Sequence, residues 1–254
     1  LRTVSKGKDV IFFGINYPYH QWELYMKPLT AAVIEAAENT NATLLFPGNI
    51  YAFGSIPEPI REETPCEPTT KKGRIRFEME EMLQEASSKG ECRVINLRMP
   101  DFWGPNVTNG LIKPLFGNAA EGKTMQWLVR SDVSHQFVFT PDAAKLFHRL
   151  SMETSLPSYF VLNYGGEVVP SITWLAERIS FFAKTPAKLR VYSKGMLKLL
   201  GIFMPQVREL VENFYQFEHC IILDDSKLRS MYPDWEDTNL DQGIDETIKW
   251  FRNN

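Results

Sequence analysis

Three short apolar runs, at residues 10–15, 43–46 and 94–97, constrain the fold of this chain more than any other feature. None of them alternates apolar with polar residues, which is typical of strands buried on both faces of a sheet. The stretches between them carry apolar residues at helical spacing, most clearly residues 22–38. Strands and helices that alternate in this way form βαβ units, so we predict an α/β protein with a parallel sheet flanked by helices.

The pattern changes after residue 156. Residues 159–162 favour one more strand, and SITWLAERI predicts a helix that begins after Pro170. Amphipathic stretches follow at residues 193–203 and 205–217, and a last helix is expected at residues 241–251. We therefore divide the chain into residues 1–155, which contain most of the sheet, and residues 156–254, which form mostly a second lobe interleaved with the first.

Charge and hydropathy exclude several classes of partner. The net charge of -3 and the pI near 5.9 give no general attraction to nucleic acid or to anionic membranes. No apolar run approaches the ~20 residues that a membrane span needs, and no signal peptide is visible. We expect a cytoplasmic protein that binds neither nucleic acid nor membrane.

The three cysteines predict no covalent or metal framework. Cys66, Cys92 and Cys220 are odd in number and widely spaced, and no CxxC pair occurs. This pattern indicates neither a disulfide scaffold nor a zinc site. Histidines and cysteines do not cluster at metal-ligand spacing, so we predict no metal site.

The order of motifs points to a known family. The strand KDVIFFGIN, the helix at residues 22–38 and the strand ATLLFP are followed by NIYAFG, PTTKKGRIR, CRVINLR, MPDFWGP and HQFVFTPDAA. This order resembles the extended short-chain dehydrogenase/reductase family, the NAD-dependent epimerases and dehydratases, from its fourth parallel strand onward. The resemblance implies a Rossmann-like sheet, a cofactor that is NAD or NADP, and a small polar substrate held by a smaller C-terminal lobe. It leaves a homodimer open.

Members of that family begin with a glycine-rich turn that places the cofactor pyrophosphate on a helix N-terminus. Residues 1–8 contain one glycine and no such turn. A central parallel strand is normally covered on both sides. We therefore expect an upstream βαβ unit to precede this chain, and we expect this chain alone to bind NAD(P) weakly or not at all.

The family's catalytic positions are occupied by other residues here. Counting back from Tyr51, the serine position of the family falls on Pro47, and Asn49 is the nearest polar replacement. Aligned with the family's YxxxK, the segment PTTKKGRIR places Lys72 at the tyrosine and Arg76 at the lysine. The resemblance thus makes Lys72, Arg76 and Asn49 the catalytic candidates, without the usual proton relay.

Two interpretations of the basic segment remain open. A threonine at residue 69 or 70 is placed to cap a helix, and four cations crowd its first turns, at Lys71, Lys72, Arg74 and Arg76. Charged runs usually face water, which makes this a solvated helix start. Alternatively, an anion would relieve the repulsion between these cations and the helix dipole, which predicts an anion or cofactor-phosphate site. In that case Lys72 could act as an acid or base.

Further candidates come from position alone. Ligands of open α/β sheets bind outside the carboxyl ends of strands. By this rule and by the resemblance, the residues that face the cofactor are Gly14, Ile15, Asn16, Pro47, Lys72, Arg76, Pro100, Asp101 and Phe102.

Aromatic and histidine side chains near the same strand ends are the candidates for the substrate site. Tyr19 and His20 follow the first strand, Trp103 lies in the turn MPDFWGP, and His135 precedes QFVFTPDAA. Packing is the alternative for each of them, and a structural role is the simpler one for His135.

We therefore predict an NAD(P)-binding, epimerase- or dehydratase-like protein that acts on an unknown small polar substrate. The competing class is a non-catalytic NAD(P)-binding sensor or scaffold that has lost the catalytic tyrosine. An enzyme should bind a small polar ligand in a cleft, whereas a scaffold should present an apolar partner surface.

Overall fold

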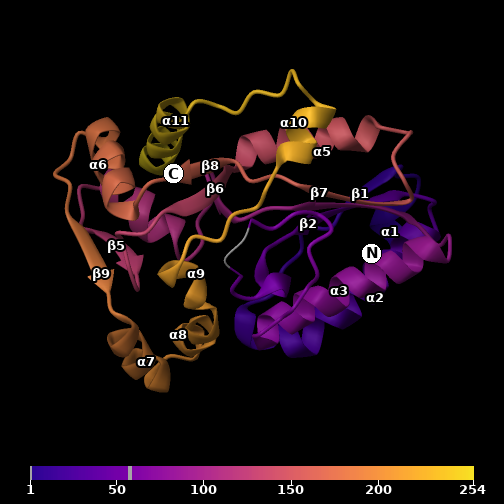
Figure 1. Cartoon of the computed structure of the whole chain (residues 1–254), viewed down its shortest axis with the longest axis horizontal. Coiled ribbons are helices and arrows are strands. Elements are labelled where there is room, and N and C mark those ends of the chain that lie inside the picture. Colours follow the sequence, from indigo (N-terminus) through magenta and orange to yellow (C-terminus); the bar gives the residue numbers. More distant parts are fainter. Residues whose placement is uncertain (1, 57–58) are drawn as a thin grey trace. The chain divides into compact units, whose positions relative to one another are not determined.

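The computed structural model describes residues 2–56 and 59–254, and Figure 1 shows its course. By internal contacts the chain divides into two units. The first comprises the described residues up to Met99 with Lys145–Tyr164 and Leu223–Met231, and the second comprises Pro100–Ala144, Gly165–Ile222 and Tyr232–Asn254. Each unit is therefore assembled from three segments of the chain, whereas the sequence-based boundary near residue 155 is a single cut.

The first unit is built on a parallel four-stranded sheet. Its strands are β1 (Val10–Phe12), β2 (Thr43–Gly48), β3 (Arg93–Arg98) and β7 (Tyr159–Asn163), in the order β1-β2-β3-β7. Leu45 lies opposite Ile95, and Ile95 lies opposite Phe160. The parallel sheet predicted from the apolar runs is confirmed, including the strand expected at residues 159–162.

Helices cover both faces of this sheet. The segments are α1 (Arg2–Ser5), the 3₁₀ turns η1 (Tyr19–Gln21) and η2 (Tyr51–Phe53), α2 (Trp22–Glu38), α3 (Lys71–Ser88), α5 (Thr140–Met152) and α10 (Ser226–Met231). Figure 1 shows α2 and α3 side by side on one face, with α5 and α10 on the other. Met26 of α2 and Met79 and Leu83 of α3 join Leu44 and Val94 of the strands in one apolar core.

Strand β1 differs from the prediction. Its apolar sequence predicts burial on both faces, but Val10 is 38% and Phe12 is 54% exposed. That prediction is wrong because β1 lies at the edge of the described sheet and pairs only with β2. The ring of Phe12 instead packs edge-on against Phe147, with ring centroids 5.0 Å apart.

The second unit contains two small sheets. One has the order β4-β6-β8, formed by β4 (Asp101–Trp103), β6 (His135–Phe139) and β8 (Glu167–Val169), with β4 parallel and β8 antiparallel to β6. The other pairs β5 (Met125–Leu128) with β9 (Leu189–Tyr192) in parallel. Aromatic side chains fill the core between these strands and the helices, and Trp127 and Phe116 are each 1% exposed.

Its helical segments include the predicted ones, and η3 (Lys113–Gly117) and α4 (Asn118–Ala120) are additional to them. The others are α6 (Ile172–Ala183), α7 (Lys194–Phe203), α8 (Pro205–Leu210), η4 (Val211–Asn213), α9 (Tyr215–Glu218) and α11 (Leu240–Asn253). The helices expected after Pro170, at residues 193–203 and at residues 241–251 are confirmed. The stretch at residues 205–217 consists of three short turns of helix instead of one continuous element.

Candidate functional site

Helix α3 begins where the sequence predicted a cap. Thr70 is in extended backbone conformation, and its side-chain hydroxyl accepts a hydrogen bond from the Gly73 N–H at 3.0 Å. This bond satisfies one of the N–H groups that a helix start leaves without an intrahelical partner. The capping prediction is confirmed at Thr70, and the cap sets which residues of the basic segment point inward.

The four cations of this segment divide into two pairs. Lys71 and Arg74 are exposed, whereas Lys72 is 2% and Arg76 is 7% exposed. Residues four apart lie on one face of a helix, and here that face is turned toward the sheet. The solvated-helix interpretation therefore fits Lys71 and Arg74 but not Lys72 and Arg76.

Arg76 reaches the carboxyl end of β2. Its Nη2 donates a hydrogen bond to the carbonyl oxygen of Pro47, and its guanidinium lies over the Phe46 ring, 4.6 Å from the centroid. The buried Nε has no hydrogen-bond partner among the described residues. Burial lowers the pKa of Arg76, and the neighbouring Glu80 and two phenols act in the opposite direction.

Lys72 lies against the ring of Tyr19. Its Nζ is 5.6 Å from the centroid of the Tyr19 ring, and the hydroxyls of Tyr19 and Tyr51 are hydrogen-bonded at 2.8 Å. Trp22 packs edge-on against Tyr19 with ring centroids 5.0 Å apart. Both tyrosines are half-buried, whereas Lys72 is buried.

Gly73 permits this arrangement. A Cβ atom added there would lie 2.4 Å from the Tyr51 carbonyl oxygen, a distance that no side chain tolerates. The absence of a side chain lets α3 approach η2 closely. On the other side of η2, the Asn49 Oδ1 accepts a hydrogen bond from the Tyr51 N–H at 3.0 Å. The catalytic candidate Asn49 thus uses its oxygen to hold the turn that carries Tyr51.

The remaining candidates of the first unit follow β1. Gly14, Ile15 and Asn16 are all exposed, as is His20 in η1. The Asn16 Oδ1 accepts a hydrogen bond from the Tyr17 N–H at 3.0 Å. These residues are accessible, and their assignment to a cofactor or a substrate stays a prediction.

The second unit brings two predicted residues together. Asp101 of β4 and His135 of β6 are joined by a hydrogen bond of 2.8 Å between Oδ2 and Nε2. His135 is 6% exposed, and its ring lies against Phe137 and Trp127 at centroid distances of 4.5 and 5.5 Å. These contacts favour the structural role for His135.

The turn residues beside β4 are largely inside the second unit. Pro100 is buried and Phe102 is half-buried. Trp103 is 4% exposed and stacks on Phe116, with ring centroids 5.5 Å apart. Packing therefore accounts for Trp103, whose role in a substrate site stays a prediction.

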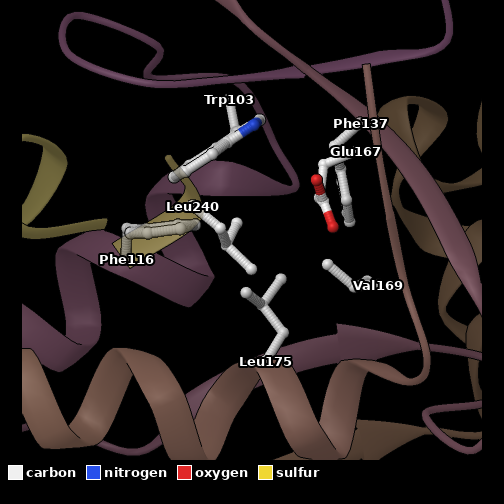
Figure 2. Close-up of a pocket in the computed structure, with 7 residues that line it drawn as sticks. All are labelled: Trp103, Phe116, Phe137, Glu167, Val169, Leu175 and Leu240. Carbon is white, nitrogen blue, oxygen red and sulfur yellow. The ribbon is translucent and has the colours of Figure 1, made fainter. Parts of the chain in front are cut away.

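One face of Trp103 borders a small cavity of about 10 Å³. Figure 2 shows the carboxylate of Glu167 pointing toward its otherwise apolar walls. The seven lining residues are Trp103, Phe116, Phe137, Glu167, Val169, Leu175 and Leu240. Burial raises the pKa of Glu167, and the nearby Asp237 raises it further.

Sequence reasoning missed two of the residues described here. Tyr51 served only as a reference point for counting, although an aromatic residue with a polar end directly after a strand was a usable signal. Glu167 lies far from any motif, and nothing in its local sequence indicates a pocket.

No group of three or more His, Cys, Asp or Glu residues in residues 2–56 and 59–254 is arranged to hold a metal ion. Within the same residues, no helix is both long enough and apolar enough to cross a membrane.

A family profile identifies the chain. The profile of the NAD-dependent epimerase/dehydratase family matches residues 25–163, more than half of the sequence. The chain belongs to this family. The match includes β2, η2, α3 and β3, and therefore the whole segment that carries Lys72 and Arg76, and it confirms the resemblance drawn from the order of motifs. No curated protein matches this epimerase/dehydratase family member.

Solved structures confirm the fold of this epimerase/dehydratase family member. It is similar to UDP-glucuronic acid 4-epimerase from Bacillus cereus in complex with NAD, with a TM-score of 0.74, 14% identity, and coverage of 96% of this chain and 74% of that one. It is also similar to UDP-N-acetylglucosamine 4-epimerase from Methanobrevibacter ruminantium in complex with UDP-N-acetylmuramic acid. For this structure the TM-score is 0.75 and the identity 18%, and the match covers 99% of this chain and 79% of that one. A third similar structure is dTDP-glucose 4,6-dehydratase from Bacillus anthracis in complex with NAD. Its TM-score is 0.74 and its identity 17%, and the match covers 97% of this chain and 73% of that one. At these identities the likeness establishes a Rossmann-like α/β fold and leaves the ligands of this chain to be argued from its own residues.

Proposed function

We propose that this chain binds NAD or NADP and serves an epimerase- or dehydratase-type reaction on a small polar substrate. The observation that carries the proposal is the burial of Lys72 and Arg76 side by side on the inner face of α3. Similar solved structures contain NAD, and the relatives named above are enzymes of sugar nucleotides. A small polar substrate of that class fits the family and the accessible polar residues around η1.

The physical argument starts from the cost of burying charge. Taking a cation out of water costs several kcal/mol unless partners compensate for the lost solvation. The Arg76 Nε is buried and has no hydrogen-bond partner in the described chain, while Nη2 donates to the Pro47 carbonyl. A ligand oxygen near the carboxyl end of β2 would complete this set of donors.

The described residues fit part of a dinucleotide. Lys72, Arg76 and the Pro47 backbone offer cationic and polar groups at a strand end, where the exposed Gly14–Asn16 backbone also lies. A glycine-rich turn suited to a pyrophosphate does not occur in the described sequence. A bound nicotinamide cofactor would supply hydride transfer, and the protein residues would bind it and hold protons.

Roles follow for the other candidates. Asn49 orients η2, while Tyr19 and His20 are the accessible substrate-facing residues of the first unit. In the second unit, Pro100, Asp101 and Phe102 are the cofactor-facing candidates, and Trp103 and His135 stay assigned to the substrate with packing as the alternative.

The experiment is cofactor binding by calorimetry, made with the protein as it is naturally expressed. Arg76→Ala should weaken binding of NAD or NADP by roughly 1.5–3 kcal/mol, the scale of a charge-assisted hydrogen bond. Arg74→Ala is the matched control, because Arg74 lies on the same helix and is exposed. Equal effects of the two substitutions, or no binding by the wild type, would overturn the proposal.

The non-catalytic alternative rests on a different observation. Lys72, at the position of the family's tyrosine, is 2% exposed, so its amine has little access to a substrate. A sensor or scaffold would bind cofactor and convert no sugar nucleotide of a panel into an epimer or a dehydrated product. Turnover that disappears in Lys72→Met while cofactor binding persists would show that Lys72 contributes to catalysis and would exclude this alternative.

We also infer a cytoplasmic location, which the three unpaired cysteines support. A homodimer and a monomer fit the proposal equally well. Fractionation of cells and light scattering of the purified protein test these two points.

A further inference from the structure

The Tyr19–Tyr51 pair carries an inference that deepens the proposed function. The two residues are 32 positions apart, yet their hydroxyls are 2.8 Å from each other. Neither occupies a position that the family resemblance marks as catalytic. The pair lies above two buried cations on one helix face, a combination that packing alone does not require.

We propose that the Tyr19–Tyr51 pair is the proton-transfer group of this site, with one phenol exchanging a proton with a hydroxyl or carbonyl group of the substrate. This proposal rests on the proposed function for its substrate class. The proton that the phenol gives up is taken by the substrate oxygen, and the nicotinamide cofactor of the proposed function would supply or accept the hydride. The phenol that gives up its O–H proton becomes a phenolate, and the second phenol then donates a hydrogen bond to that oxygen.

The cations stabilise the charged form of the pair. Lys72 lies 5.6 Å from the Tyr19 ring centroid, and both phenolates would interact favourably with the Arg76 guanidinium. A nearby opposite charge lowers the pKa of a phenol because it favours the ionised form. Buried cations act more strongly here than the exposed Lys71 and Arg74, because water does not screen them.

Other charged groups around the pair have weaker effects. Glu80, the next residue along the buried face of α3, is neutralised by its contact with Arg98. His20 of η1 and Glu23 of α2 are exposed to solvent. Trp22, which packs against both rings, carries no titratable group.

The geometry also explains how the phenols are held. Trp22 packs against both rings, edge-on to Tyr19 and tilted to Tyr51, at centroid distances of 5.0 and 6.3 Å. Asn49 fixes the Tyr51 backbone, and Gly73 brings α3 to within contact of it. A pair fixed in this way exchanges protons without first rearranging, which favours catalysis.

The test is a spectroscopic titration of phenolate formation in the protein without cofactor or substrate. One of the nine tyrosines should ionise below about pH 9, at least one unit under the ordinary value of ~10. Tyr19→Phe and Tyr51→Phe should each remove or raise this early step, and Lys72→Met should raise it by about one unit or more. Tyr25→Phe is the control, because Tyr25 is 42% exposed and lies outside the pair.

The outcomes separate this proposal from the proposed function. If all tyrosines of the wild type ionise at or above pH 10, or if the early step survives in both tyrosine variants, the pair is not the proton-transfer group. The wild-type titration decides the first point even where a variant fails to fold. Loss of cofactor binding in the calorimetry would overturn the proposed function while leaving an early-ionising phenol unaffected.

Discussion

Arg98 and Glu80 form a buried ion pair in which two guanidinium nitrogens share one carboxylate oxygen. The Arg98 Nε and Nη2 donate to the Glu80 Oε2 at 3.2 and 2.8 Å, and the two side chains are only 7% and 5% exposed. Arg98 also donates to the Glu62 carbonyl oxygen at 3.1 Å and lies over the Phe53 ring. The pair therefore joins the end of β3 to α3 on the same helix face that carries Lys72 and Arg76.

Removing one partner of this pair should be costly. Glu80→Ala leaves the Arg98 cation buried without a counter-charge, and we expect a loss of about 3–5 kcal/mol in the free energy of unfolding. The double variant Glu80→Leu/Arg98→Met should recover most of that loss. Glu85→Ala, which breaks an exposed pair with Lys89 on the same helix, should leave stability unchanged. Denaturant unfolding measures all three, and a small effect of Glu80→Ala would contradict the buried pair.

Arg76 should act against stability. Burial lowers its pKa, so the folded state binds this proton less tightly than the unfolded chain does, and folding is disfavoured at every pH at which free arginine is charged. Arg76→Met should therefore raise the free energy of unfolding by about 1–3 kcal/mol while it weakens cofactor binding. Thermal melts and calorimetry on the same samples test both effects. A destabilised Arg76→Met variant would show that the Pro47 and Phe46 contacts outweigh the lost solvation.

Two glycines in helices should respond in opposite ways to the same substitution. Gly73→Ala brings a Cβ to 2.4 Å from the Tyr51 carbonyl, so α3 and η2 must separate, and we expect destabilisation of about 1–3 kcal/mol. Gly195, in α7, has no atom within 4 Å of an added Cβ. Gly195→Ala should stabilise by up to about 1 kcal/mol, because alanine favours helix. Chemical denaturation compares them, and equal effects would argue against the close approach at Tyr51.

Alkaline pH should unfold the first unit through buried acids. Burial raises the pKa of Tyr159 to about 12, and the nearby Glu80 adds to this. Because the unfolded tyrosine ionises at ~10, the unfolded state loses its proton first, and stability falls between about pH 10 and 12. We expect a loss of roughly 2 kcal/mol from this residue across that window.

Tyr159→Phe provides the control for the alkaline transition, since it removes the ionisable group and keeps the ring. Its stability should decline less steeply above pH 10 than that of the wild type. Cys92 adds a similar but earlier contribution, since burial raises the pKa of its thiol to about 11. Parallel curves for Tyr159→Phe and the wild type would exclude Tyr159 as a cause.

Local sequence determined the elements of this protein. The apolar runs predict β2, β3 and β7, helix α2 matches residues 22–38, and Thr70 caps α3 as expected. These features depend on neighbouring residues, through strand hydrophobicity, helical spacing and capping chemistry. The family membership follows from the same local signals, because it depends on their order along the chain.

Tertiary structure decided which residues form a site. From the sequence, Lys72 and Arg76 could be either solvated or buried, since a charged run has the same composition in either place. Only the packing of α3 on the sheet buried them. It placed Tyr19 and Tyr51 in separate motifs, and the fold joined their hydroxyls. Burial and contacts between distant segments depend on the whole chain at once. A local pattern therefore determines the helices and strands, whereas their packing determines which side chains come together in a site.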